Sequence, residues 1–262
     1  MRNTVNALIV VVLLLVSLGI IALATTSSVR AERSFDDPSH YVKLQLAWVV
    51  ISILIGYVLT RIDYHLWQRL SVPLVVGILF LLVLVFVPGI GVRVGGSQRW
   101  IRLIGPIRLQ PSELAKIVEI IVLSTWMAYI GRRCIKFKEG LLYPILGLGV
   151  LLGLVIKEPD YGTTVLMGLT GMVMLFAGGV RIHYLVITGA LALSAFSIAV
   201  LHDRVRFIRI LAFLEPEKYP ASAYHLTQSK IAFILGGFSG VGLGESIQKH
   251  FYLPESHTDF IL

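Results

Sequence analysis

The sequence predicts an all-α protein that crosses a membrane several times. Hydrophobic residues make up 56% of the 262 residues, and charged residues only 15%. Mainly apolar runs of about 20 residues, the length that a helix needs to cross the hydrocarbon core of a bilayer, recur from the N-terminus onward. Because lipid offers the backbone no hydrogen-bonding partner, these runs are expected to be helices.

Seven segments qualify as membrane spans. They are Ala7 to Thr25, Leu44 to Thr60, Leu70 to Pro88, Pro111 to Ile130, Leu141 to Ile156, Gly162 to Val180 and Tyr184 to Leu201. Ala22-Leu23-Ala24 imitates a signal-peptide cleavage site, but the apolar run before it is long for a signal peptide and further spans follow. The first segment is therefore interpreted as a transmembrane helix.

An arginine-rich segment separates the third span from the fourth. Glycines and a proline between residues 95 and 106 predict a loop, whereas Pro111 favours the first position of a helix. Glu113, Lys116 and Glu119 then share one helix face. Since charge inside a membrane is usually functional, Lys116 is interpreted either as a cation that faces a substrate or as part of a structural ion pair.

A short polar break, Lys157 to Thr163, lies between the fifth and sixth spans. Its proline and glycine predict a tight reversal of the chain. The carboxylates of Glu158 and Asp160 are interpreted either as solvated turn residues, which is the commoner case, or as groups close to a site at that membrane face.

The chain changes character after Leu201, so two regions are predicted: transmembrane helices in residues 1–201 and a large loop in residues 202–262. The apolar stretch Ile231 to Phe238 is too short to span, so it is expected to lie in the interface or to re-enter the membrane. The glycines that follow lack the strand and the spacing of a nucleotide site. Neither a nucleotide nor a nucleic acid is an expected ligand.

The segment Tyr252 to Phe260 concentrates polar chemistry in Glu255, His257 and Asp259. Acids and histidines are mostly surface residues, so the residues alone favour an exposed loop. A Ser256/His257/Asp259 triad is not supported, because no nucleophile turn is present. His257 and Asp259 alone form no recognisable metal motif.

Charge counting does not settle the orientation. With the N-terminus inside, eight basic residues fall in inner segments and eight in short outer loops. The outer arginines are explained equally well as solvated loop charges and as ligands of an anionic substrate.

Four separated blocks resemble one family. They are Gly96 to Trp100 with Gln110 to Lys116; Glu158 to Thr163; Arg206 to Pro216 with Tyr224, Gln228 and Ser229; and Gly236 to Phe260. In this order they resemble the SEDS family (shape, elongation, division and sporulation), typified by FtsW, RodA and SpoVE. Ser246 to Lys249, followed by Tyr252 to Asp259, is most similar to the division branch, FtsW.

The resemblance implies a peptidoglycan glycosyltransferase that polymerises lipid II into glycan strands during septal cell-wall synthesis and cell division. Asp259 would be the general base. Other residues would bind the substrate or tune Asp259: Arg99, Arg108, Lys116, Arg206, Glu255 and His257. No metal ligand is assigned, although a divalent cation (Mg²⁺ or Mn²⁺) that bridges carboxylate and pyrophosphate is compatible with the chemistry.

The resemblance also implies partners and a location. The expected partners are lipid II, a class B penicillin-binding transpeptidase and other membrane proteins of the division machinery. The expected place is the bacterial inner membrane, with a cytoplasmic N-terminus and residues 202–262 outside. Since the family's chains continue for about three further helices, this chain is expected to be truncated at its C-terminus.

Other functions stay open on the sequence alone. Charges within the spans, such as Lys116 and Glu119, would suit a lipid II flippase. The elongation paralogue of the RodA type, which controls cell shape, shares the same blocks. A noncatalytic scaffold is a third alternative.

Overall fold

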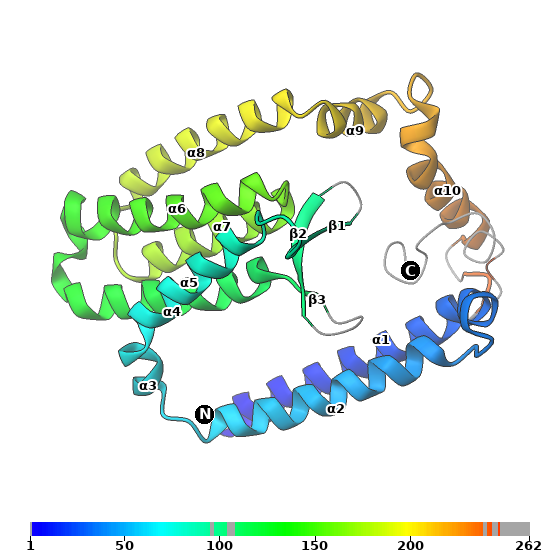
Figure 1. Cartoon of the computed structure of the whole chain (residues 1–262), viewed down its shortest axis with the longest axis horizontal. Helices are drawn as coiled ribbons and strands as arrows, with labels where there is room; N and C mark the ends of the chain where they lie inside the picture. Colours follow the sequence, from blue (N-terminus) through cyan, green and yellow to red (C-terminus); the bar gives the residue numbers. More distant parts are fainter. Residues whose placement is uncertain (1, 95–96, 104–107, 238–239, 243–245, 247–262) are drawn as a thin grey trace. The chain divides into compact units, whose positions relative to one another are not determined.

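The computed structural model describes residues 2–94, 97–103, 108–237, 240–242 and 246 (Figure 1). The helices are α1 (Arg2–Phe35), α2 (His40–Thr60), α3 (Tyr64–Arg69), α4 (Ser71–Leu84), α5 (Pro111–Ile130), α6 (Tyr143–Lys157), α7 (Tyr161–Ala177), α8 (Ile182–His202), α9 (Arg204–Leu214) and α10 (Pro220–Gly236). Two short helical turns, η1 (Gly131–Ile135) and η2 (Phe137–Leu142), connect α5 to α6. The strands are β1 (Gly91–Val94), β2 (Ser97–Arg102) and β3 (Arg108–Leu109).

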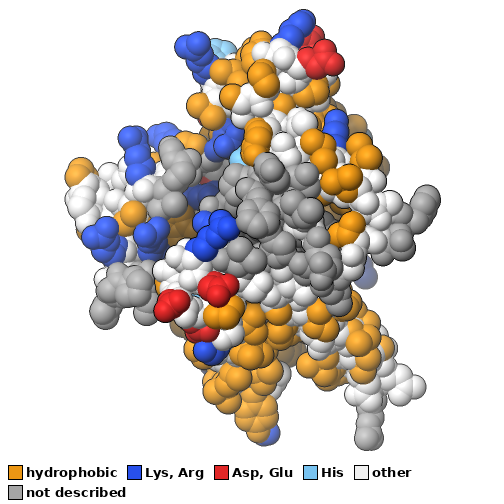
Figure 2. Space-filling view, turned by 90° about the vertical axis from the view of Figure 1, so that its right-hand side faces the viewer, with side chains coloured by type: hydrophobic (Ala, Val, Ile, Leu, Met, Phe, Trp, Pro, Cys, Tyr) orange, Lys and Arg blue, Asp and Glu red, His pale blue; other side chains and the backbone are white. Residues whose placement is uncertain are grey.

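Each of the seven predicted spans coincides with a helix, and the predicted polytopic helical fold is confirmed. Within the described residues, five helical segments are long and apolar enough to cross a membrane: Asn3–Ser28, His40–Thr60, Pro111–Ile135, Phe137–Lys157 and Ile182–His202. Ser71–Leu84 and Tyr161–Ala177 are shorter apolar helices in the other two positions. Apolar side chains are gathered on the outer surfaces of helices (Figure 2), as lipid-facing helices require.

The chain divides into two compact units, and the first comprises residues 1–61 and 198–262. Here α1 packs along α2, and α9 contacts α10. Between α1 and α2, Asp37 accepts hydrogen bonds from Ser39, and its Oδ2 lies 2.8 Å from Nζ of Lys43 in the first turn of α2. These hydrogen bonds, that of Lys43 first, lower the pKa of Asp37 to about 2.

The region from residue 202, where the sequence predicted a large loop, contains two helices, α9 and α10.

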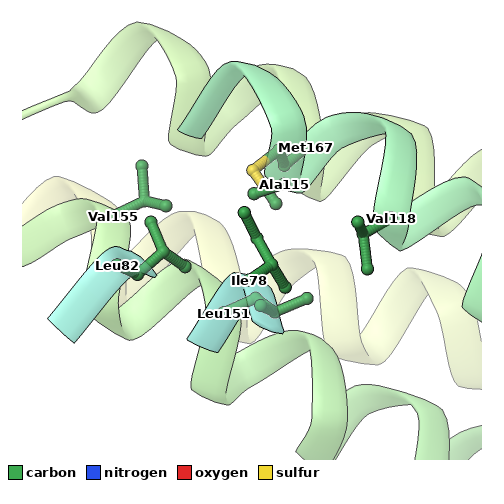
Figure 3. Packing of buried hydrophobic residues seen from close by; sticks show 7 residues of the cluster. All are labelled: Ile78, Leu82, Ala115, Val118, Leu151, Val155 and Met167. Carbon is green, nitrogen blue, oxygen red and sulfur yellow. The ribbon is translucent and has the colours of Figure 1, made fainter. Parts of the chain in front are cut away.

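The second unit, residues 62–197, holds a helix bundle in which α5 packs on α4 and α7, and α6 packs on α7 (Figure 1). Its core is a cluster of aliphatic side chains from α4, α5, α6 and α7 that point toward one another (Figure 3). The cluster comprises Ile78, Leu82, Ala115, Val118, Leu151, Val155 and Met167. Because lipid is as apolar as these side chains, close packing rather than hydrophobic burial holds them together.

A three-stranded antiparallel sheet lies at one end of this bundle (Figure 1), where the sequence predicted a loop. That prediction was wrong for residues 97–102, because β-branched and aromatic residues there outweigh the loop signal of the glycines. Ile101 is buried, and Gln98 Nε2 donates to the backbone oxygen of Val85 at 2.9 Å. A Cβ at Gly91 would lie 1.8 Å from that same oxygen, so only glycine fits at residue 91, where the chain that has left α4 enters the sheet.

Candidate functional site

Asp160 organises the polar end of the second unit. It lies within the Lys157 to Thr163 break and is the N-cap of α7, where its side chain accepts a hydrogen bond from the Thr163 backbone N–H at 3.3 Å. The Thr163 hydroxyl donates to Asp160 Oδ2 at 3.0 Å. An aspartate is among the best residues at this position because its oxygen satisfies amides that the first turn of a helix leaves unpaired.

Two residues from the start of α5 also reach this carboxylate. Gln110 Nε2 donates to Asp160 Oδ2 at 2.9 Å, and the Ser112 hydroxyl lies 3.3 Å from the same atom. Gln110 Nε2 additionally donates to Ser112 Oγ at 3.0 Å. Pro111 occupies the first turn of α5, as predicted, and Gln110 and Ser112 are its neighbours in sequence at the start of this helix.

Arg99, from β2, supplies the positive charge. Its Nη1 lies 3.7 Å from Asp160 Oδ1, and its side chain remains 36% exposed while that of Asp160 is only 6% exposed. Its buried Nε has no hydrogen-bond partner among the described residues. The guanidinium is therefore anchored at one side by a buried carboxylate and retains donors for a ligand. We call Arg99, Gln110, Ser112, Asp160 and Thr163 the Asp160 cluster.

Glu158 lies beside this cluster and is fully buried. Both of its carboxyl oxygens lack a hydrogen-bond partner among the residues that the structure describes. Burial raises the pKa of Glu158 to about 8, the nearby Asp160 carboxylate raises it as well, and Arg99 opposes the rise. Glu158 and Asp160 are therefore buried and are not solvated turn residues. Their burial fits the other interpretation that the sequence left open, in which they lie close to a site.

Replacing Glu158 by glutamine is expected to flatten the pH dependence of stability. The folded state binds the Glu158 proton more tightly than the unfolded state, whose ordinary pKa is 4.5, so this carboxyl destabilises the fold as the pH rises from 4.5 through about 8. Glu158→Gln cannot ionise. Thermal unfolding in detergent should show the variant gaining on the wild type by at least about 2–4 °C between pH 5 and pH 9. Parallel profiles would contradict the burial of this group.

The other predicted site residues lie in different surroundings. Arg108 is exposed in β3, opposite Arg102. Lys116 Nζ lies 2.8 Å from Glu113 Oε2, the ion pair that the sequence left as an alternative. Arg206, in α9 of the first unit, has its Nε 4.0 Å from Asp203 Oδ2. Glu255, His257 and Asp259 lie outside the described residues, so their roles stay predictions.

The sequence did not assign Gln110, Ser112 or Thr163 to a site, and it offered a site near Asp160 only as the less common of two interpretations. All four belong to blocks that carry the family resemblance, and that was the available signal. A partnership between residues 50 positions apart, such as Gln110 and Asp160, leaves no trace in local patterns.

The described residues do not suit a divalent cation. No group of three or more histidine, cysteine, aspartate or glutamate side chains within them is arranged to hold a metal ion. The accepting oxygens of Asp160 are already engaged by neutral donors and by Arg99.

Comparison with known proteins identifies the family. The FtsW/RodA/SpoVE family model, described as cell cycle protein, matches residues 5–262. A probable peptidoglycan glycosyltransferase FtsW from Trichlorobacter lovleyi is 43% identical, over 97% of this chain and 67% of its own length. Another from Legionella pneumophila is 40% identical, over 94% of this chain and 63% of its own length. The chain spans about two thirds of the length of these relatives.

Solved structures show the same fold. One of them is a chain of a peptidoglycan synthase complex whose structure describes how polymerization and crosslinking are coordinated. It aligns with a TM-score of 0.64 at 23% identity, over 91% of this chain and 70% of its own. The rod shape determining protein RodA of Thermus thermophilus aligns with a TM-score of 0.53 at 24% identity, over 71% of this chain and 58% of its own. The family prediction is thus confirmed, and the chain is a multi-pass membrane protein that belongs to the FtsW/RodA/SpoVE family.

Proposed function

We propose that the full-length protein is a peptidoglycan glycosyltransferase of the FtsW type, which polymerises lipid II into glycan strands for septal cell-wall synthesis and cell division. The names of the relatives support both the activity and the division branch, since those at 43% and 40% identity are probable peptidoglycan glycosyltransferases FtsW. The RodA-type elongation enzyme is the related alternative.

The geometry of Arg99 is the observation that carries the proposal. In the reaction, the bond from the donor sugar to its pyrophosphate breaks while the acceptor 4-hydroxyl bonds to the same carbon with inversion. The pyrophosphate leaves with the electron pair, so negative charge develops there. A guanidinium that is already anchored by Asp160 and still partly exposed stabilises such charge without reorganising during the reaction. The proton of the 4-hydroxyl passes to Asp259, the proposed general base.

The remaining substrate contacts rest on family resemblance. Arg108, Lys116 and Arg206 would add positive charge around the pyrophosphate, and Glu255 and His257 would orient or tune Asp259. A divalent cation (Mg²⁺ or Mn²⁺) bound near the pyrophosphate would offset its negative charge, and no residue is assigned to hold it.

The location and partners are proposed on the same ground. The N-terminus would be cytoplasmic in the bacterial inner membrane, and the region after α8 would face outward. The partners would be a transpeptidase of the class B penicillin-binding type, which would crosslink the glycan, and other membrane proteins of the division machinery. The likeness to a synthase complex that coordinates polymerization and crosslinking supports such a partner.

Polymerisation of lipid II by the purified full-length protein tests the proposal. Glycan strands are expected from lipid II alone in detergent or proteoliposomes, and their formation should require Asp259. A flippase would behave differently: labelled lipid II would cross proteoliposome membranes without forming polymer, transport would be lost in Lys116→Ala, and Asp259→Ala would be harmless. That second pattern would overturn the enzyme proposal.

A further inference from the structure

A cavity of about 280 Å³ lies within the α4–α7 bundle, apart from the Asp160 cluster, with which it shares no lining residue. Its walls come from α4, α5 and α6, including the first residues of α6. They are almost entirely apolar, with Val75, Leu79, Val122 and Leu151 among them. Val150 lines the cavity and is itself 55% exposed, so the cavity lies close to the surface of the bundle.

One carboxyl group interrupts this apolar wall. Glu119, in the middle of α5, lines the cavity and is only 2% exposed. Neither of its oxygens has a hydrogen-bond partner in the described part of the chain. Lys116, one turn earlier on the same helix, pairs with Glu113 instead. A carboxyl group buried among apolar side chains costs free energy until a partner satisfies it.

The opposite side of Glu119 leaves no space for such a partner. There α7 approaches so closely that a Cβ at Gly171 would lie 2.9 Å from Glu119 Oε1 and 2.6 Å from Leu148 Cδ2. The cavity is therefore the open side of the carboxyl group. Buried polar groups in native proteins are nearly always satisfied, so a partner is expected to come from within the cavity.

From this arrangement we infer that the cavity is a binding site for an alkylammonium amphiphile, whose ammonium group pairs with Glu119 and whose chain occupies the apolar space. An ammonium group matches the carboxylate in charge and donates charge-assisted hydrogen bonds. At about 30 Å³ per heavy atom, the share of one water molecule in the liquid, the cavity takes roughly nine heavy atoms. Bromoheptylamine, with seven carbons, one bromine and one nitrogen, has that size.

Trp126 provides a reporter inside the cavity. It follows Glu119 by seven residues, which places both on the same face of α5, about 10 Å apart along the axis. Its indole N–H donates to the backbone oxygen of Glu139 at 2.9 Å, so the ring is held in place. A ligand whose ammonium group binds at Glu119 therefore places its distal bromine beside Trp126, and bromine quenches indole fluorescence on contact.

The test is saturable quenching of tryptophan fluorescence by bromoheptylamine in the full chain, reconstituted in nanodiscs. Saturation is expected in the wild type and in Glu113→Gln, which removes an exposed carboxylate from the same helix. Glu119→Gln should weaken the affinity by at least about tenfold. Trp126→Phe should lose the saturable signal, which identifies the reporter among the four tryptophans.

A second variant keeps the test independent of Glu119. A Cβ at Gly147, which lines the cavity, would meet no atom within 4 Å, so Gly147→Leu places a side chain in the empty space and should abolish saturation. Bromoheptanol, of the same length without charge, should bind at least about tenfold more weakly than the amine. Equal affinity of the two ligands, equal affinity in Glu119→Gln, or quenching that never saturates would each overturn the inference.

Discussion

Replacing Asp259 by alanine is expected to reduce the rate of lipid II polymerisation by about 10²–10⁴-fold in the full-length protein, the range that a positioned general base contributes. The 4-hydroxyl of a sugar is a weak nucleophile until its proton is removed, and alanine accepts no proton. The measurement is the initial rate of glycan formation at saturating lipid II. Binding of lipid II should change little, because the base acts on the acceptor hydroxyl in the transition state rather than on the bound ground state.

Ser256→Ala is the matched control in the same segment. It removes a hydroxyl but no acid, and a rate close to that of the wild type is expected. If instead both variants lost activity equally, a hydrolase-like Ser/His/Asp arrangement would return to consideration. Polymerisation that survives Asp259→Ala would remove this residue from the reaction.

Asp160→Ala is expected to lower the free energy of unfolding by about 2–4 kcal/mol. The variant loses the cap of α7, which is worth about 1 kcal/mol, and leaves the donors of Gln110, Ser112 and Thr163 without their acceptor, at about 1–3 kcal/mol in total where water does not replace it. The guanidinium of Arg99 also loses its anchor. Thermal or denaturant unfolding of the purified protein in detergent measures the loss.

Asp63→Ala tests whether capping alone explains the effect. Asp63 caps the six-residue helix α3 in the same unit by accepting from His65 N–H, but its side chain is 70% exposed. Only a small fraction of the Asp160 effect is expected there. If the two variants were equally destabilised, the buried contacts of the Asp160 cluster would contribute nothing.

The spans and the start of α5 were predictable because their signals are local. Apolar length identifies a span wherever it occurs, and Pro111 marks the start of a helix without reference to the rest of the chain. The reversal at Pro159 is local in the same way, since α6 ends at Lys157 and α7 begins at Tyr161.

What the sequence could not predict depends on contacts between distant residues. Glycines at residues 95 and 96 indicate a loop, but pairing of β1 with β2 turns their flanks into strands. Asp160 looks like a solvated turn residue until side chains from the start of α5 and from β2 reach its carboxylate. Glu119 shares a face with Lys116 in sequence, yet packing of α7 buries it while Lys116 pairs with Glu113.

The close approach of α7 to Glu119 restricts how this protein can change over generations. A methyl group at residue 171 would lie within 3 Å of the ends of the Glu119 and Leu148 side chains, so an alanine there requires both side chains to shift. Alanine at residue 171 is expected more often in relatives in which residue 119 is shorter than glutamate. Residue 119 in α5 and residue 171 in α7 should therefore co-vary among related sequences, although the two helices are separate in the sequence.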